Sequence, residues 1–129
     1  MTDLEMVRLC AEAMGLHEVV NPDERAPKPK PPSILVSDSA GLELYEPLHD
    51  DAQAMALVKK FQLRIVWGGR RQGSESYVHV SSPQYLGSDD MPYYADNLNA
   101  DLNRALCECV AKMQLCENPA HSPNGDAPS

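Results

Sequence analysis

The chain has 129 residues, which is enough for one domain but not for two. Its formal net charge of −8 argues against a general nucleic-acid binder, because neutralising phosphates needs clustered basic residues, and a solvated acidic surface is favoured over DNA mimicry. We find neither a charged-then-apolar leader nor an apolar run of about 20 residues, so neither secretion nor membrane insertion is expected.

The N-terminal residues predict a short helix with signals at both ends. Thr2 and Glu5 have the spacing of a capping box, and Gly15 stands where a left-handed residue would end the helix. Leu16 is placed to fold back onto the last turn. The apolar face of this helix consists of Leu4, Val7, Cys10, Ala11 and Met14.

Residues 21–32 alternate proline with charged residues, and such a segment favours an extended path over the surface. A spacer is the favoured interpretation, with a proline-rich ligand for a partner domain as the alternative. Residues 33–36 and 42–45 are short apolar runs around a turn-rich cluster. They indicate either a weak hairpin or a single paired strand.

Residues 47–51 predict the start of a second helix, because Asp50 can cap it and Gln53 follows three residues later. Lys59 and Lys60 suit the C-terminal end of this helix. We expect its buried stripe to contain Ala54, Met55, Val58 and Phe61.

Residues 63–67 and 76–81 predict an antiparallel pair joined by a glycine-rich connection. In the first strand Leu63, Ile65 and Trp67 should face a helix. In the second, Tyr77, His79 and Ser81 share one face, and Val78 and Val80 share the other. Pro83 is expected to end the pair, and residues 82–95 are expected to form a long loop.

The strongest periodicity predicts a long helix over residues 95–116, followed by a disordered tail at 117–129. The apolar stripe of this helix contains Leu98, Leu102, Ala105, Leu106, Cys109, Met113 and Cys116. Cys107 falls about 180° from the stripe, so we expect it to be exposed.

The candidate chemical groups are few. The four cysteines form no CxxC pair and no zinc pattern, which indicates a reduced, cytosolic protein without a metal or cofactor. Cys107 is the one cysteine that the pattern leaves open to reaction. His49, Asp50 and Asp51 could form a metal or acid/base cluster, but acids are expected at a helix entrance for capping alone.

Arg70 and Arg71 are the one concentrated positive feature, at the tip of the predicted hairpin. With Trp67, Tyr93 and Tyr94 they form a tentative binding surface for a partner or an anionic, stackable ligand such as a nucleotide. Two solvated arginines at a turn are the alternative.

Residues 45–67 and 99–114, with the capped N-terminal helix, resemble the phage ABA sandwich family of small bacteriophage and prophage proteins. The resemblance covers about half of the chain and implies an antiparallel sheet between helical layers, that is, an α-β-α sandwich. It implies no catalytic residues. The proline-rich segment 21–32 and the stretch 82–95 depart from the family pattern.

We therefore predict one α+β domain over residues 1–116 with a long C-terminal helix. The expected function is a non-catalytic phage or prophage accessory protein that binds a host or phage protein in the bacterial cytoplasm. Two alternatives stay open: a sponge for a small anionic nucleotide signal, and a small enzyme that uses Cys107 or the acids at residues 50–51. The sequence leaves the oligomeric state open.

Overall fold

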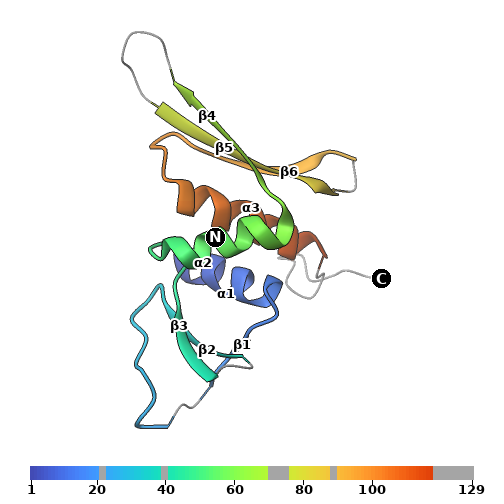
Figure 1. Ribbon diagram of the computed structural model, residues 1–129. Coiled ribbons are helices and arrows are strands. Elements are labelled where there is room, and N and C mark those ends of the chain that lie inside the picture. Colours follow the sequence, from blue (N-terminus) through green and yellow to red (C-terminus); the bar gives the residue numbers. More distant parts are fainter. Residues whose placement is uncertain (21–22, 39–40, 70–75, 88–89, 118–129) are drawn as a thin grey trace.

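The computed structural model describes residues 1–20, 23–38, 41–69, 76–87 and 90–117. Within them, three helices lie between two antiparallel three-stranded sheets (Figure 1). The predicted α+β class and the C-terminal helix are confirmed, and the helices form the middle layer of the molecule. The helices are α1 (Asp3–Ala13), α2 (Asp51–Phe61) and α3 (Leu102–Glu117). One sheet contains β1 (His17–Glu18), β2 (Ile34–Asp38) and β3 (Gly41–Tyr45), and the other contains β4 (Arg64–Gly69), β5 (Ser76–Leu86) and β6 (Pro92–Asn97).

Helix α1 has the two end signals that the sequence predicts. The Thr2 hydroxyl accepts from the Glu5 backbone N–H at 3.1 Å, and the Glu5 carboxylate accepts from the Thr2 backbone N–H at 3.2 Å. Gly15 has φ +78°, and the Leu16 N–H donates to the Ala11 carbonyl at 2.9 Å. These bonds satisfy backbone groups that a helix end leaves free.

The hairpin that the sequence left uncertain is formed by β2 and β3, with β1 added on the far side of β2. The described part of the proline-rich segment, residues 23–32, joins β1 to β2 and is mostly exposed, as predicted.

Helix α2 begins as predicted, because the Asp50 carboxylate accepts from the Gln53 backbone N–H at 2.9 Å. Its buried stripe differs in two members: Leu57 is fully buried, whereas Met55 is exposed. The helix ends at Gln62, which adopts the left-handed conformation with φ 51°.

The predicted loop over residues 82–95 is wrong, since β5 continues to Leu86 and β6 returns beside it. The ladder shifts its register between Ser81 and Leu86, and Pro83 lies in this irregular part, where no ladder hydrogen bond needs its missing N–H. The buried Ser82 hydroxyl substitutes for the ladder here. It donates to the Tyr85 carbonyl at 2.9 Å and accepts from the Tyr93 N–H at 3.1 Å.

The long helix starts at Leu102, not at residue 95, which belongs to β6. The turn between them is built on Asn97, whose side-chain oxygen accepts from the N–H groups of Asn99 and Asp101 at 2.8 and 3.0 Å. Asp101 then accepts from the Arg104 N–H at 3.2 Å, as a capping residue does. Leu98, which the periodicity placed in the helix, lies in this turn and is 71% exposed.

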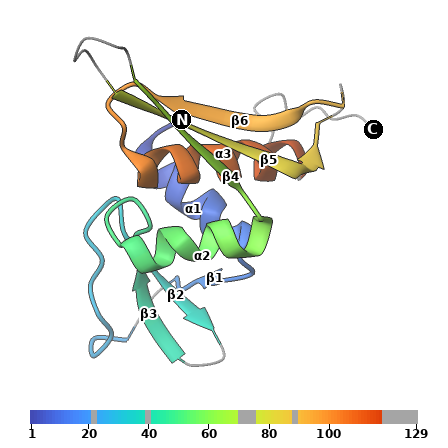
Figure 2. The same cartoon turned by 45° about the horizontal axis from the view of Figure 1, so that its top comes forward.

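Two cysteine assignments on α3 are corrected. Cys107 is fully buried and Cys116 is exposed, while Cys109 is buried as predicted. Cys107 is buried because α3 lies between the β4–β5–β6 sheet and α1, so this helix buries two sides rather than one (Figure 2). The Cys10 thiol donates to the Cys107 carbonyl at 3.4 Å on one side, and the Cys109 thiol donates to the Tyr93 carbonyl at 3.7 Å on the other.

One core connects both sheets with all three helices. Its members include Ile34 and Val36 from β2, Leu57 from α2, Val80 from β5 and Leu106 from α3. The predicted tail lies outside the described residues, apart from Glu117 at the end of α3. In the part of the chain that is described, we find no helix that combines the length and the apolar character needed to cross a membrane.

Candidate functional site

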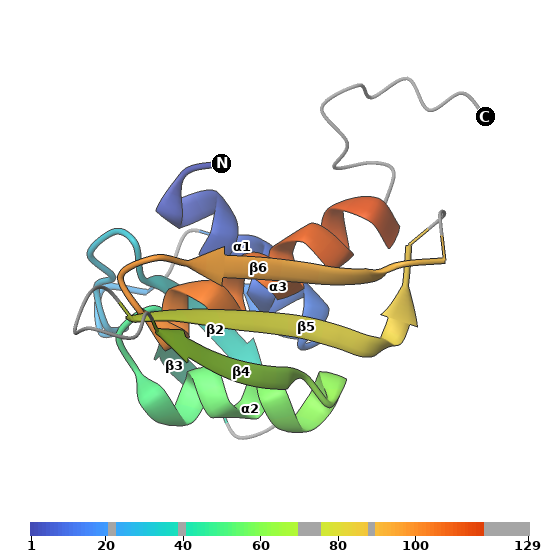
Figure 3. The ribbon, with the colours of Figure 1, turned by 90° about the horizontal axis from the view of Figure 1, so that it is seen from above.

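The face of the β4–β5–β6 sheet that points away from the helices is the candidate site, and we call it the outer face. Figure 3 views the molecule from this side, and no described helix covers the three strands. Val78, Val80 and Ala95 alternate onto the opposite, buried face. The outer face is made of Arg64, Val66, Gly68, Tyr77, His79, Ser81, Tyr94 and Asp96.

At one end of the outer face, the Tyr77 ring lies over Gly68, its partner on β4. A Cβ atom at position 68 would lie 2.2–2.5 Å from three atoms of the Tyr77 side chain. Glycine is therefore required at position 68 for this ring position, which is a common way for an aromatic residue to protect a strand glycine.

At the centre of the outer face, Val66, His79 and Asp96 stand side by side on the three strands. His79 Nδ1 lies 2.5 Å from Asp96 Oδ1. The imidazole also stacks on the Tyr94 ring, with centroids 5.6 Å apart and an interplanar angle of 27°. The carboxylate and the aromatic ring together hold the imidazole in one orientation.

Lys112 of α3 reaches the edge of the sheet beside Tyr94. Its ammonium donates to the Tyr94 carbonyl at 3.0 Å and lies 5.5 Å from the centroid of the Tyr94 ring. Carbonyl and ring thus both attract the same cation.

A groove of about 500 Å³ runs across the outer face and is lined by Val66, Tyr77, His79, Asp96 and Leu98. Tyr77 and Leu98 are exposed along it, and Val66 is exposed between them. Large apolar side chains are thus gathered around a carboxylate and an imidazole. Contiguous exposed apolar surface with polar groups beside it is typical of a binding surface.

A second hollow, of about 400 Å³, borders the turn that joins β6 to α3. Its lining contains two carboxylates, Asp51 and Asp101, and the exposed side chain of Met55. The Asp51 carboxylate accepts from the Asn103 side-chain amide at 2.9 Å. The remaining lining residues are Ala100, Leu102 and Asn103.

The structure separates the residues of the tentative binding surface. Tyr94 is on the outer face and is 54% exposed. Tyr93 alternates onto the buried face and packs partly against the core. Trp67 pairs with Val78, so it belongs to the buried face too, but it is 58% exposed because α3 packs under β5 and β6 and leaves the end of β4 uncovered. Arg70 and Arg71 lie outside the described residues.

The sequence did not single out the groove as a site. The alternation on β5 correctly placed Tyr77 and His79 on one face. Strand β6 was not predicted, because the sequence pattern indicates loop and helix over these residues. Asp96 on β6 and Leu98 directly after it complete the lining of the groove.

The other candidate reactive groups, which are the cysteines and the residues at the start of α2, make structural contacts. Burial raises the pKa of Cys109 to about 12, and the hydrogen bond to Cys107, together with burial, raises the pKa of Cys10, so both thiols stay protonated. Asp50 caps α2, Asp51 holds Asn103, and the His49 imidazole contacts Glu46. Among the described residues, no three histidine, cysteine or acidic side chains are grouped so that they could hold a metal ion.

Comparisons with protein-family models, with curated proteins and with solved structures give no match for this chain. The resemblance to phage ABA sandwich proteins stays a prediction.

Proposed function

We propose that the protein is a non-catalytic binding module that contacts a protein partner through the outer face of the β4–β5–β6 sheet. The observation that carries the proposal is the groove with its exposed rim, where Val66, Tyr77 and Leu98 surround the His79–Asp96 pair. Tyr94 extends the same surface on the other side of His79. Aromatic residues are enriched in protein interfaces, because a ring buries much area at a small entropic cost.

The two alternative functions have less support. For a nucleotide sponge, the described lining of the groove supplies a carboxylate from Asp96 but no lysine or arginine, and a carboxylate repels phosphate. For an enzyme that uses a thiol, Cys107 is fully buried and presents no surface to a substrate. The phage resemblance makes a host or phage protein in the bacterial cytoplasm the expected partner.

The test is capture of a partner on the immobilised protein, followed by purification of that partner and calorimetry. The decisive variant replaces both Tyr77 and Tyr94 by serine, and we expect its affinity to fall at least about tenfold. The matched control replaces Leu42 and Leu44 by serine, because both are exposed on β3 of the other sheet. Far-UV circular dichroism of each variant checks that the fold is kept.

Equal affinity of the Tyr77/Tyr94 variant and the wild type would overturn the proposal. Calorimetry against a panel of linear and cyclic nucleotides tests the sponge directly. Micromolar binding of one nucleotide, together with no loss of partner affinity in the tyrosine variant, would favour the sponge instead.

A further inference from the structure

The two hollows both border the turn that joins β6 to α3, and their linings share a chemical character. Leu98 lines the groove, and Ala100 and Asp101 line the second hollow. Only one residue lies between Leu98 and Ala100, and two lie between Leu98 and Asp101, so one extended ligand can contact both hollows. Leu98 on the turn and Met55 on α2 are exposed apolar side chains beside this path.

The charged residues that the structure describes in the two linings, His79 apart, are all carboxylates. Asp96 belongs to the groove, and Asp51 and Asp101 belong to the second hollow. Among the described residues, neither lining contains a lysine or arginine. Arg104 is nearby: its guanidinium donates two hydrogen bonds of 2.9 and 3.0 Å to Asp3, and its Nε lies 3.9 Å from Oδ2 of Asp101, so Asp101 already has a cationic neighbour.

The carboxylates are held in place by the fold. Asp96 is oriented by His79, Asp51 by Asn103, and Asp101 by the Arg104 backbone N–H. The contacts of Asp96 and Asp51 use one oxygen of a two-oxygen group, whereas the second oxygen of Asp101 also faces the Arg104 guanidinium; a carboxylate has about four acceptor positions. A cation at the surface therefore meets carboxylates whose positions are already fixed, so less entropy is lost on binding.

We propose that this surface, which runs from Tyr77 along the groove and over Leu98 to Asp101, binds an extended basic segment of a protein partner. The inference rests on the proposed function and adds the chemistry of the partner. The apolar stem of an arginine or lysine packs between Tyr77 and Leu98, over Val66, and its charged end meets Asp96. A second basic residue further along reaches Asp101 and Asp51, and an apolar residue packs on Leu98.

Charge complementarity disfavours two other occupants. The net charge of −8 opposes the approach of a second copy of the chain. An acidic segment would place its carboxylates against those of Asp96 and Asp101. A basic segment gains from both the local carboxylates and the overall charge, which also speeds its encounter with the protein.

The experiment uses fluorescein-labelled peptides of about ten residues, which span roughly 33 Å when extended. One peptide alternates leucine with arginine, a second alternates leucine with glutamate, and a third alternates glycine with arginine. Anisotropy titrations of the whole protein give the affinities, and ¹H–¹⁵N amide shifts locate the contact. We expect the leucine–arginine peptide to bind tightest, to shift Tyr77, Asp96 and Leu98, and to weaken as salt is added.

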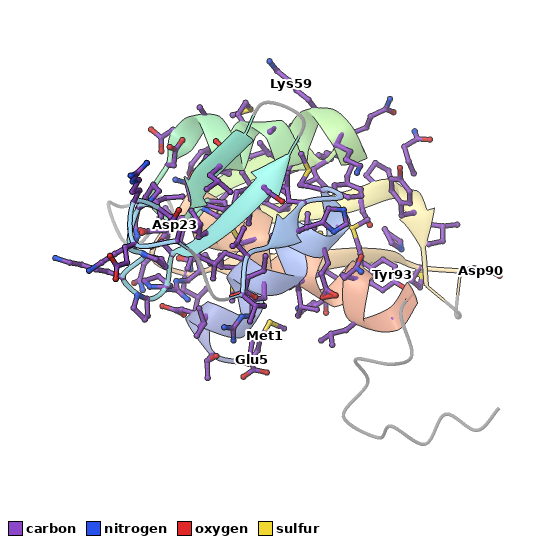
Figure 4. All side chains as sticks on the ribbon, turned by 90° about the horizontal axis from the view of Figure 1, so that it is seen from below. Met1, Glu5, Asp23, Lys59, Asp90 and Tyr93 are labelled. Carbon is purple, nitrogen blue, oxygen red and sulfur yellow. The ribbon has the colours of Figure 1, made fainter. Side chains whose placement is uncertain are left out.

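Two substitutions with matched controls test the roles of charge and apolar contact. Asp96→Asn and Leu98→Ser should each weaken the leucine–arginine peptide at least about fivefold. Asp23→Asn and Leu42→Ser are the controls, since both residues are exposed away from the groove. Figure 4 shows Asp23 from below, on the side opposite to the outer face.

The inference is overturned if the leucine–glutamate peptide binds as tightly, if the leucine–arginine peptide does not bind at all, or if Asp96→Asn has no effect. These outcomes are distinguishable from failure of the proposed function. A captured partner that depends on Tyr77 and Tyr94 but not on Asp96 or salt would leave the binding module intact and remove only its preference for basic segments.

Discussion

At the scale of single residues, burial decides which cysteine reacts. Cys10, Cys107 and Cys109 are buried in the helical layer, whereas Cys116 near the end of α3 is exposed. We expect one thiol of the four to react with a disulfide reagent in the native protein at about pH 8, and all four to react after unfolding in guanidinium. The Cys116→Ser variant should show no rapid reaction. A second rapidly reacting thiol would contradict the burial of α3.

Substitutions of Gly68 and Tyr77 should have non-additive effects on the free energy of unfolding. Alanine at position 68 forces the Tyr77 ring away, because its Cβ atom would overlap with the far end of that side chain. Gly68→Ala should therefore lower the free energy of unfolding by about 1 kcal/mol in a urea titration. In a Tyr77→Ala background the same substitution should cost little, since the obstructing ring is gone. Equal costs in both backgrounds would show that the ring does not lie over Gly68.

At the scale of elements, the end of α2 contains a residue that is poorly suited to its conformation. Gln62 has φ 51° and ψ 51°, which costs about 1 kcal/mol for a residue with a Cβ atom. Gln62→Gly should raise the free energy of unfolding by about 0.5 kcal/mol, because glycine relieves this strain but gains entropy in the unfolded chain. Gln62→Ala is the control and should bring no gain. Chemical denaturation measures both, and a loss of stability in the glycine variant would contradict the left-handed cap.

The Asp3–Arg104 ion pair joins α1 to α3 and should make stability depend on pH. Hydrogen bonds from Arg104 hold the pKa of Asp3 below its ordinary value of 3.8. A lowered pKa in the folded state stabilises the protein above the unfolded pKa, and this stability is lost as the pH falls through the folded pKa. Both side chains are more than one-third exposed, so the pair contributes only about 0.5 kcal/mol at pH 7.

Unfolding titrations of wild type and Arg104→Met should differ by this amount at neutral pH and converge as the pH falls through the lowered pKa of Asp3. Arg25→Met is the control, since Arg25 is exposed in the proline-rich segment. A difference that stays constant down to low pH would mean that Arg104 stabilises the fold by packing alone.

Elements with local end signals were predictable, and those that depend on distant partners were not. The capping residues Thr2 and Asp50 and the terminating Gly15 act within a few residues, so the sequence located α1 and α2. Strand β6 was missed because its register comes from pairing with β5, which no local pattern encodes. The same omission hid the groove, since Asp96 reaches His79 only when β6 is in place.

Cys107 was placed wrongly for a related reason. A helical wheel identifies the most apolar stripe, but a helix in the middle layer has two buried sides. Cys107 contacts α1 through its carbonyl, and Cys109 contacts β6. Small apolar residues on both sides of the stripe are the sequence signal that indicates a helix with two buried sides.

At the scale of the whole molecule, the shared core predicts cooperative unfolding. Val36 in one sheet, Val80 in the other and Leu106 in α3 belong to the same buried cluster. We expect their amide protons to exchange with the same free energy of opening, within about 1 kcal/mol, because exposing any of them breaks that cluster. Hydrogen exchange followed by NMR measures this. Markedly faster exchange at Val36 would show that the β1–β2–β3 sheet opens on its own.

The contact between Lys112 and Tyr94 has a consequence for behaviour at high concentration. Strand β6 is an edge of its sheet, and a free edge is a template on which another chain can add a strand and begin aggregation. The Lys112 ammonium already occupies the Tyr94 carbonyl, and an approaching strand would have to displace a charge. We therefore expect Lys112 to oppose strand addition at the Tyr94 position of the β6 edge. Aromatic side chains can then be exposed on the adjacent face with less aggregation through this edge.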